Sequence, residues 1–148
     1  MMTLSSILMP VDFSEPSREA THYALFLAQK FGARLDLLYV IDDSQFFSPA
    51  FGGFTPTREQ WEAFADTSLE NWLTAEVVGD VKVTRHRILG TPFLQIVRYA
   101  RDQNSDLIVM GTHGRSGMMA GLLGSVAEKV LRKAPCPVLT VKSGAHEP

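Results

Sequence analysis

Cysteine is almost absent from this sequence, and positive charge is not in excess. Cys136 is the one cysteine among 148 residues, so the sequence offers no intrachain disulfide. A formal net charge of -2 gives no basic surplus to neutralise phosphates, which argues against a nucleic-acid-binding protein. No apolar run approaches the roughly 20 residues of a membrane span, and no basic stretch precedes the first apolar run, as a signal peptide requires. We therefore expect a cytoplasmic protein that binds neither membranes nor nucleic acids.

The common nucleotide-handling motifs are missing too. The sequence contains no Gly-Lys pair, hence no Walker A loop, and no G-x-G-x-x-G fingerprint. His113-Gly114 lacks the preceding histidine of the H-x-G-H pattern that one group of nucleotidyl transferases carries. The residues after Asp12 lack the serine- and glycine-rich loop that one group of pyrophosphatases carries after its first strand. We therefore assign no catalytic residue and expect any enzymatic turnover to be slow or absent, below about 1 per second.

The sequence does show a regular alternation of apolar runs and helical patterns. The expected strands are Ser6–Val11, Arg34–Ile41, Val81–Ile88, Asp106–Met110 and Pro137–Val141. The expected helices are Glu15–Phe31, Arg58 to about Leu73, one that opens at Thr91-Pro92, and Ser125–Lys133. This order predicts an α/β fold with a doubly wound, Rossmann-like sheet of five parallel strands and helices on both faces. A chain of 148 residues fits a single domain over 1–148.

Positions within these elements follow from the spacing of apolar residues. The strand at 106–110 is the most continuously apolar and is expected in the centre, whereas 81–88 and 137–141 are expected near the edges. Ser14 is the expected N-cap of the first helix and Gly32 its C-terminal stop. Thr57 and Gln60 form a capping-box pattern. The inner face of the first helix is expected to comprise Ala20, Tyr23, Ala24, Leu27, Ala28 and Phe31.

The segment Ser44–Pro56 interrupts the alternation. It holds four phenylalanines with Gly52-Gly53 and has no helical period. Three interpretations stay open at this point: a lid over a ligand, a contact with another subunit, or an insertion whose rings cover the domain's own surface.

The segment from Gly111 to Ser125 is rich in glycine and follows an apolar strand. Glycine allows backbone N–H groups to approach an anion closely, and the N-terminus of the next helix adds unpaired donors and positive potential. The segment therefore predicts a phosphate site made of backbone groups. The spacing of its last glycines also fits a tightly packed helix, but each glycine costs a helix nearly 1 kcal/mol relative to alanine, which favours a loop.

The spacing G-x2-G-x9-G-S, from Gly111 to Ser125, resembles the nucleotide-binding signature of the universal stress protein family. Other segments are similar to that family as well: Met9–Ser14, Tyr39–Asp42, Gly90–Pro92, Leu107–Gly114 and Pro135–Val138. The resemblance implies that Asp12 and Val40 contact adenosine, and that the signature glycines and Ser125 hold ribose and phosphates. It implies an ATP-binding stress-response protein. Because the phosphate segment supplies neutral donors and at most one arginine for several negative charges, we expect Mg2+ to be held through the nucleotide phosphates.

The candidate nucleotide-binding residues are Pro10, Asp12, Ser14, Val40, Met110, Gly111, His113, Gly114, Arg115, Gly124, Ser125 and Val126. Some of them have structural alternatives. Asp12 is also placed to cap the first helix, and Ser125 forms an S-x-x-E capping box with Glu128. Arg115 either reaches a phosphate or is a solvated loop cation, and His113 has no partner at metal-ligand spacing.

Three functions remain open: a nucleotide-binding regulatory protein, a slow ATPase, or a nucleotide-free interaction protein of the same fold. For the oligomer we expect a homodimer through Pro137–Val141, because an apolar edge strand with unpaired backbone groups is normally covered or paired. The resemblance implies the same interface.

Overall fold

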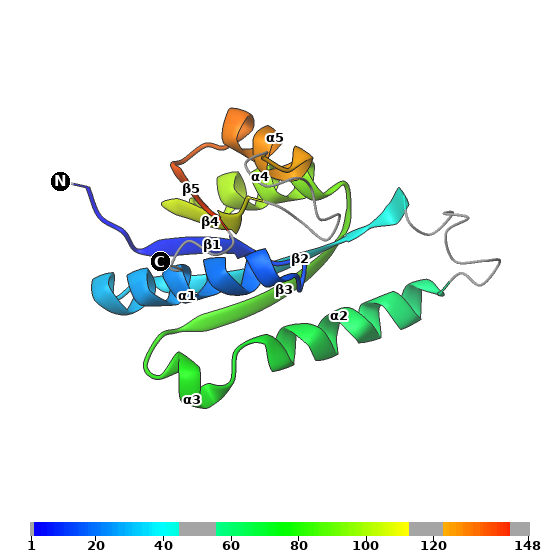
Figure 1. The fold of residues 1–148 in the computed structure, drawn as a ribbon, viewed down its shortest axis with the longest axis horizontal. Coiled ribbons are helices and arrows are strands. Elements are labelled where there is room, and N and C mark those ends of the chain that lie inside the picture. Colours follow the sequence, from blue (N-terminus) through cyan, green and yellow to red (C-terminus); the bar gives the residue numbers. More distant parts are fainter. Residues whose placement is uncertain (1, 45–55, 113–122, 143–148) are drawn as a thin grey trace.

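The structure, a computed structural model, describes residues 2–44, 56–112 and 123–142. Its centre is a five-stranded sheet in the order β3-β2-β1-β4-β5, and every neighbouring pair is parallel (Figure 1). The strands are β1 (Ser6–Pro10), β2 (Arg34–Asp42), β3 (Val83–Gly90), β4 (Leu107–Gly111) and β5 (Val138–Val141). The predicted fold class is confirmed.

Helices cover both faces of this sheet. They are α1 (Glu15–Phe31), α2 (Arg58–Trp72), α3 (Ala75–Val78), α4 (Pro92–Asp102) and α5 (Ser125–Lys133). The first strand of the chain, β1, is the middle strand of the sheet. The next two strands, β2 and β3, lie on one side of it, and β4 and β5 lie on the other side. Right-handed crossovers place helices on opposite faces when the direction of building reverses. Accordingly, α1 and α2 lie on one face and α4 and α5 on the other (Figure 1).

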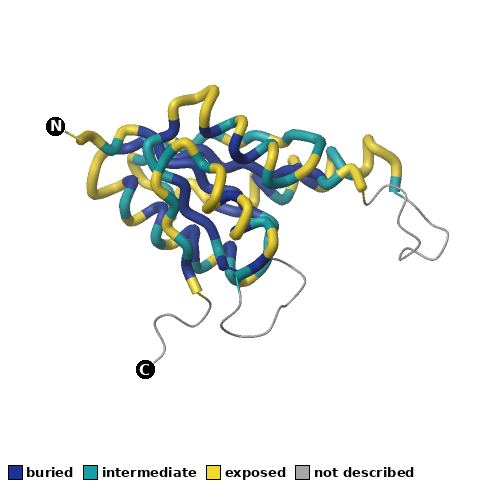
Figure 2. The backbone as a smooth tube through the Cα atoms, turned by 90° about the horizontal axis from the view of Figure 1, so that it is seen from above, coloured by how far each residue is buried: buried dark blue, intermediate teal, exposed yellow. Residues whose placement is uncertain are grey.

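The apolar core consists of two layers, one on each face of the sheet. Alternate residues of β2 divide between them: Leu35 and Leu37 pack toward α1 and α2, and Leu38 and Val40 toward α4 and α5. All five residues of β1 are buried. Figure 2 shows buried segments gathered in the interior of the molecule and exposed segments around them. The middle strand is therefore β1. The strand expected in the centre, β4, is the interior strand beside it.

The helix boundary signals correspond to the observed ends. Ser14 caps α1 by accepting from the Ser17 backbone N–H, Gly32 ends it in the left-handed conformation at φ 65°, and the Thr57–Gln60 capping box is formed at α2.

Phe31 is the exception to the expected inner face of α1, because it is 61% exposed. At 17 residues α1 is about 25 Å long, longer than the five-residue strands beneath it, so its last turn extends past them.

A buried charge lies under α4, near the amino end of β2. Asp36 is fully buried, and its carboxylate accepts from Arg34 at 2.8 and 3.0 Å and from Thr84 Oγ1 at 2.6 Å. Arg34 is two residues away on the same strand face, and Thr84 is the β3 residue in register with Asp36. Burial, with the nearby Asp36 charge, raises the pKa of Tyr99 to about 12. The carboxylate is thus paired and hydrogen-bonded, as a buried charge requires.

The two edge strands are those expected, and they differ in character. β3 carries Arg85, His86 and Arg87, whereas β5 reads Val-Leu-Thr-Val and leaves Leu139 37% exposed. Among the described residues, no helix combines the length and apolar character that a membrane span needs.

Candidate functional site

A cavity of about 250 Å3 opens at the carboxyl end of the sheet, where β1, β2 and β4 finish. Ligands of doubly wound folds bind at this end, near the point where strand order reverses. Eight of the candidate residues line the cavity: Pro10, Asp12, Val40, Met110, Gly111, Gly124, Ser125 and Val126. His113, Gly114 and Arg115 lie outside the described residues, as do 45–55 of the phenylalanine-rich segment and most of the glycine-rich segment.

Asp12 lies in the turn between β1 and α1, and its carboxylate is held by the first turn of that helix. Its Oδ1 accepts from the Ser14 backbone N–H at 3.0 Å, from Ser17 Oγ at 2.7 Å and from the Ser14 hydroxyl. The Asp12 backbone N–H in turn donates to Ser17 Oγ at 3.1 Å. The carboxylate therefore supports the residues that begin α1, as the capping interpretation expects, and it also lines the cavity.

Ser14 is positioned differently from its neighbour. It is the N-cap of α1, and its side chain bonds to Asp12 and to the Ser17 backbone, but it is not among the residues that line the cavity. Its direct effect is to fix Asp12, and through Asp12 the shape of the cavity wall.

The end of β2 adds a second carboxylate. Asp42 lines the cavity, and its Oδ1 accepts from the Ser44 backbone N–H at 3.0 Å and from Ser44 Oγ at 2.7 Å. Asp12 follows β1 after Val11, and Asp42 is the last residue of β2, so both lie at the carboxyl edge of the parallel sheet. Asp42 was not among the candidate residues predicted from the sequence, although its position at a strand end was a usable signal.

The opposite wall is formed by the end of β4 and the start of α5. The Gly124 backbone N–H donates to the Thr112 carbonyl at 2.6 Å, and the Thr112 N–H donates to Val141 at 3.0 Å. Helix α5 begins at Ser125 with Gly124 as its N-cap, and no side chain caps it. The predicted capping box of Ser125 and Glu128 is therefore wrong: Ser125 is the first helical residue.

The N-cap of α5 lies one residue earlier than predicted, and this position determines which backbone N–H groups face the cavity. The Glu128 N–H bonds to the Gly124 carbonyl, and the Glu128 side chain pairs with Arg132 at 2.9 Å. Glu128 therefore does not reach back to cap the helix. In an α-helix the first N–H groups have no carbonyl one turn before them, and here those are the N–H groups of Ser125–Ala127. All three residues line the cavity, so the positive end of α5 faces it.

Gly111 is required by packing as well as by its place in the signature. A Cβ atom added at Gly111 would lie 2.9 Å from both the backbone carbon and the Cβ of Pro16, which is closer than Cβ atoms come to neighbouring atoms in proteins. The end of β4 thus lies directly against the first turn of α1. Any side chain at 111 would separate these two elements, both of which shape the cavity.

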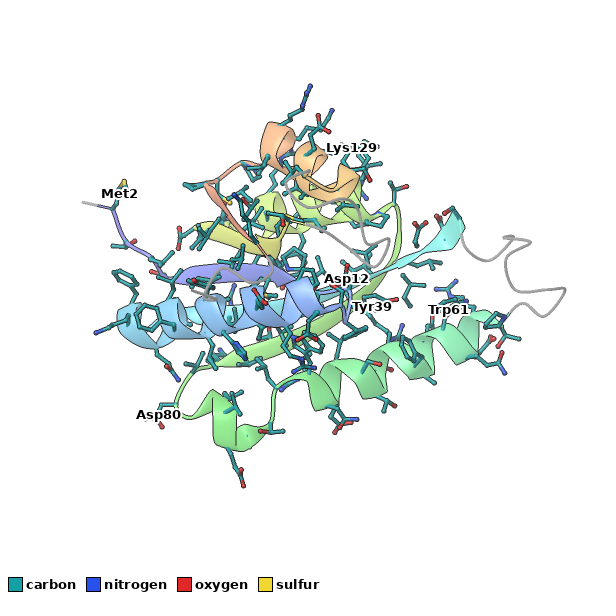
Figure 3. All side chains as sticks on the ribbon, viewed as in Figure 1. Met2, Asp12, Tyr39, Trp61, Asp80 and Lys129 are labelled. Carbon is teal, nitrogen blue, oxygen red and sulfur yellow. The ribbon has the colours of Figure 1, made fainter. Side chains whose placement is uncertain are left out.

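Several lining residues were not found from the sequence. Trp61 on α2, Pro92 and Ile96 on α4, and Thr112 after β4 all border the cavity. No sequence pattern shows that α2 passes near the end of β2. Figure 3 shows Trp61 on α2 with Asp12 and Tyr39 on the sheet side. Within the described residues no three histidine, cysteine, aspartate or glutamate side chains gather as a metal cluster.

Comparison with known proteins agrees with this geometry. A model of the family described as the universal stress protein family matches residues 3–142. The chain belongs to the universal stress protein family. It is 37% identical over 142 residues to universal stress protein MJ0531 of Methanocaldococcus jannaschii, covering 95% of this chain and 84% of the relative.

Solved structures extend the comparison. The structure of MJ0577, a second universal stress protein of that archaeon, has a TM-score of 0.80 at 30% identity and covers 95% of this chain and 97% of its own. A universal stress protein of Archaeoglobus fulgidus, solved in complex with dAMP, has the same fold at 21% identity, with a TM-score of 0.63 over 96% of this chain and 100% of its own.

Proposed function

We propose that this universal stress protein binds an adenine nucleotide, ATP, in the cavity at the carboxyl end of its sheet. The observation that carries the proposal is that two walls of different chemistry border a single cavity. One is formed by the β1 and β2 ends with fixed side-chain acceptors, and the other by the uncapped N-terminus of α5.

The wall near β1 and β2 suits adenosine. Pro10, Val40 and Met110 supply apolar surface for a purine ring. Asp12 supplies an acceptor, and every hydrogen bond described for its carboxylate falls on Oδ1. Its Oδ2 is then placed to accept from an amino or hydroxyl group of the nucleoside.

The wall near α5 suits phosphates. The three N–H groups at the start of α5 donate to anionic oxygens, and the Ser125 hydroxyl adds a fourth donor. Gly114 and Arg115, in the segment between Thr112 and Gly124, extend this wall in the proposal. A triphosphate needs more positive charge than neutral N–H groups and one arginine supply, and Mg2+ bound through the phosphates provides it.

Calorimetric titration with ATP, with and without Mg2+, tests the proposal. We expect saturable heat, with tighter binding in the presence of Mg2+. Absence of both heat and thermal stabilisation at millimolar ATP contradicts it. A nucleotide that copurifies with the protein, identified by chromatography of the denatured sample, is a second positive result.

The proposed role is regulatory, in the stress response and in the cytoplasm, and turnover is slow or absent. Asp12 and Asp42 are the acidic side chains that line the described part of the cavity, and both are engaged by serine neighbours. Neither is positioned as a general base by the described geometry. Phosphate release from ATP at about 1 per second or faster contradicts this part of the proposal.

A homodimer through Pro137–Val141 is the proposed assembly. The apolar edge of β5, with Leu139 exposed, supports antiparallel pairing of two copies about a two-fold axis. Leu139→Lys is expected to shift the sedimentation coefficient toward that of a monomer. Leu94→Lys, an equally apolar and more exposed position on α4, is the matched control and is expected to leave the dimer unchanged. A wild-type monomer at micromolar concentration contradicts the interface.

A further inference from the structure

An aromatic side chain from outside the glycine signature borders the cavity. Trp61 lies in the first turn of α2, the helix that follows the phenylalanine-rich segment, and lines the same cavity as Asp12 and Asp42. It is half-buried, so part of the indole is packed and part is exposed. Figure 3 shows α2 carrying Trp61 near the end of β2.

The position of Trp61 is fixed from its own helix. The Thr57–Gln60 capping box defines the start of α2, and the Trp61 backbone N–H donates to the Thr57 carbonyl at 3.0 Å. The indole ring meets the Phe64 ring edge to face, with centroids 6.3 Å apart at 85°. The ring is therefore held by backbone and by packing before any ligand arrives.

A second set of ring contacts connects α2 to the turn that carries Asp12. The Phe13 ring lies 5.9 Å from that of Phe64, 4.7 Å from Tyr39 and 5.5 Å from Trp72. Phe13 directly follows Asp12 and has a φ of 64°, a conformation that non-glycine residues rarely adopt. The aromatic contacts compensate this cost, so the same ring cluster fixes the Asp12 turn and the helix that presents Trp61.

We propose that Trp61 is a base-contacting residue whose indole stacks on the purine ring of the bound nucleotide. This inference rests on the proposed function and adds to it the side chain that recognises the base. Stacking of a base on an aromatic side chain changes affinity by about 5- to 150-fold. A bicyclic purine covers more of an indole than a pyrimidine does, so Trp61 favours ATP over UTP or CTP.

The two tryptophans of the chain allow a direct optical test. Trp72 is 8% exposed, donates from Nε1 to Thr21 Oγ1 at 2.8 Å and lies under Arg18, and it is not among the cavity-lining residues. Trp72→Phe leaves Trp61 as the sole emitter, and its emission is expected to change saturably with ATP. Trp61→Phe leaves Trp72, whose emission is expected to stay constant. Constant emission of Trp61 at saturating ATP overturns the inference.

The ATP affinities of two Trp61 variants provide a second test. Trp61→Leu keeps apolar volume but removes the ring, and we expect about ten-fold weaker ATP binding and a reduced preference for ATP over UTP. Trp61→Phe keeps a ring and is expected to retain most of the affinity. Equal ATP affinity in wild type and Trp61→Leu, both confirmed as folded by circular dichroism, overturns the inference.

These measurements separate two failures. If wild-type protein gives no heat with ATP, the proposed function fails. If wild-type protein binds ATP while the loss of the Trp61 ring changes neither affinity nor base preference, the cavity binds nucleotide and only the stacking role of Trp61 is wrong.

Discussion

The two walls of the cavity are built in different ways. The side-chain wall, formed by Asp12, Asp42 and Trp61, is held by contacts between side chains: serines bond to both carboxylates, and Phe64 packs on the tryptophan. The backbone wall, formed by Gly111-Thr112 and Gly124–Ala127, offers the N–H groups of Ser125–Ala127.

From this difference we expect the two walls to recognise different parts of a nucleotide. Side chains distinguish one base from another because their shapes and donors differ, whereas phosphate is bound through groups that every residue except proline possesses. Substitutions on the side-chain wall should therefore change which ligand binds. Substitutions on the backbone wall should matter through the space they occupy. The predictions that follow test this distinction, beginning with the largest expected effect.

Gly114→Val is expected to abolish ATP binding while the fold persists. Gly114 is the second glycine of the signature, and in the proposed site a β-branched side chain would occupy the space through which backbone approaches an anion. Calorimetry measures the loss, and an unchanged circular dichroism spectrum shows that the variant is folded. If the variant binds ATP as wild type does, the assignment of phosphate to this segment is wrong, and the glycines have to be explained by packing.

Gly111→Ala is expected to act through stability as well as binding. Its Cβ lies 2.9 Å from the backbone carbon of Pro16, so β4 and α1 must separate at a cost of about 1–3 kcal/mol. The melting temperature should fall by roughly 2–4 °C per kcal/mol. Gly79→Ala, where no atom lies within 4 Å but φ is 59°, is the control for backbone strain without crowding. A smaller loss at 111 than at 79 contradicts the packing explanation.

Asp12→Asn separates the two tasks of the side-chain wall. An amide oxygen still accepts from the serines 14 and 17, so stability should change by less than about 1 kcal/mol. The second carboxylate oxygen becomes an NH2 donor, which faces the donor group of the nucleoside, and ATP affinity should fall about ten-fold. Asp12→Ala should lower both affinity and stability. Equal affinity for Asp12→Asn and wild type shows that this carboxylate is purely structural.

Ser125→Ala is expected to have the smallest effect. A capping serine costs about 1 kcal/mol when it is removed, but the N-cap of α5 is Gly124, so the stability change should stay within about 0.5 kcal/mol. Because backbone N–H groups supply most of the proposed phosphate donors, affinity should fall less than about five-fold. A large loss of affinity at unchanged melting temperature identifies the hydroxyl as a principal ligand contact.

Much of the fold followed from local patterns because the forces behind them are local. Ser14 and Gly32 bound α1 through capping and left-handed backbone geometry, and the Thr57–Gln60 box starts α2. The strand runs alternate with helices, which leaves a parallel, doubly wound sheet as the arrangement that covers both apolar faces. The same reasoning placed Pro137–Val141 at an edge, because a short apolar strand closes the chain.

The candidate site was predictable where its residues stand at strand ends or in the signature. Asp12, Val40 and Met110 lie at or near the carboxyl ends of parallel strands, and those ends share one edge of the sheet. The cap of α5 was misjudged by one residue because S-x-x-E is a statistical preference. The bond of Gly124 to Thr112 decides where the chain turns into the helix.

The sequence alone determined the ends of α1, the start of α2, the doubly wound fold class and the candidate nucleotide-binding residues, since capping and apolar periodicity depend on a few neighbouring positions. Only the tertiary structure decided that Gly111 must lack a side chain because of Pro16, that Asp36 can be buried because Arg34 and Thr84 meet it, and that Trp61 borders the cavity. Each of those facts depends on a distance between elements remote in the chain or on the register between strands, and packing sets such distances.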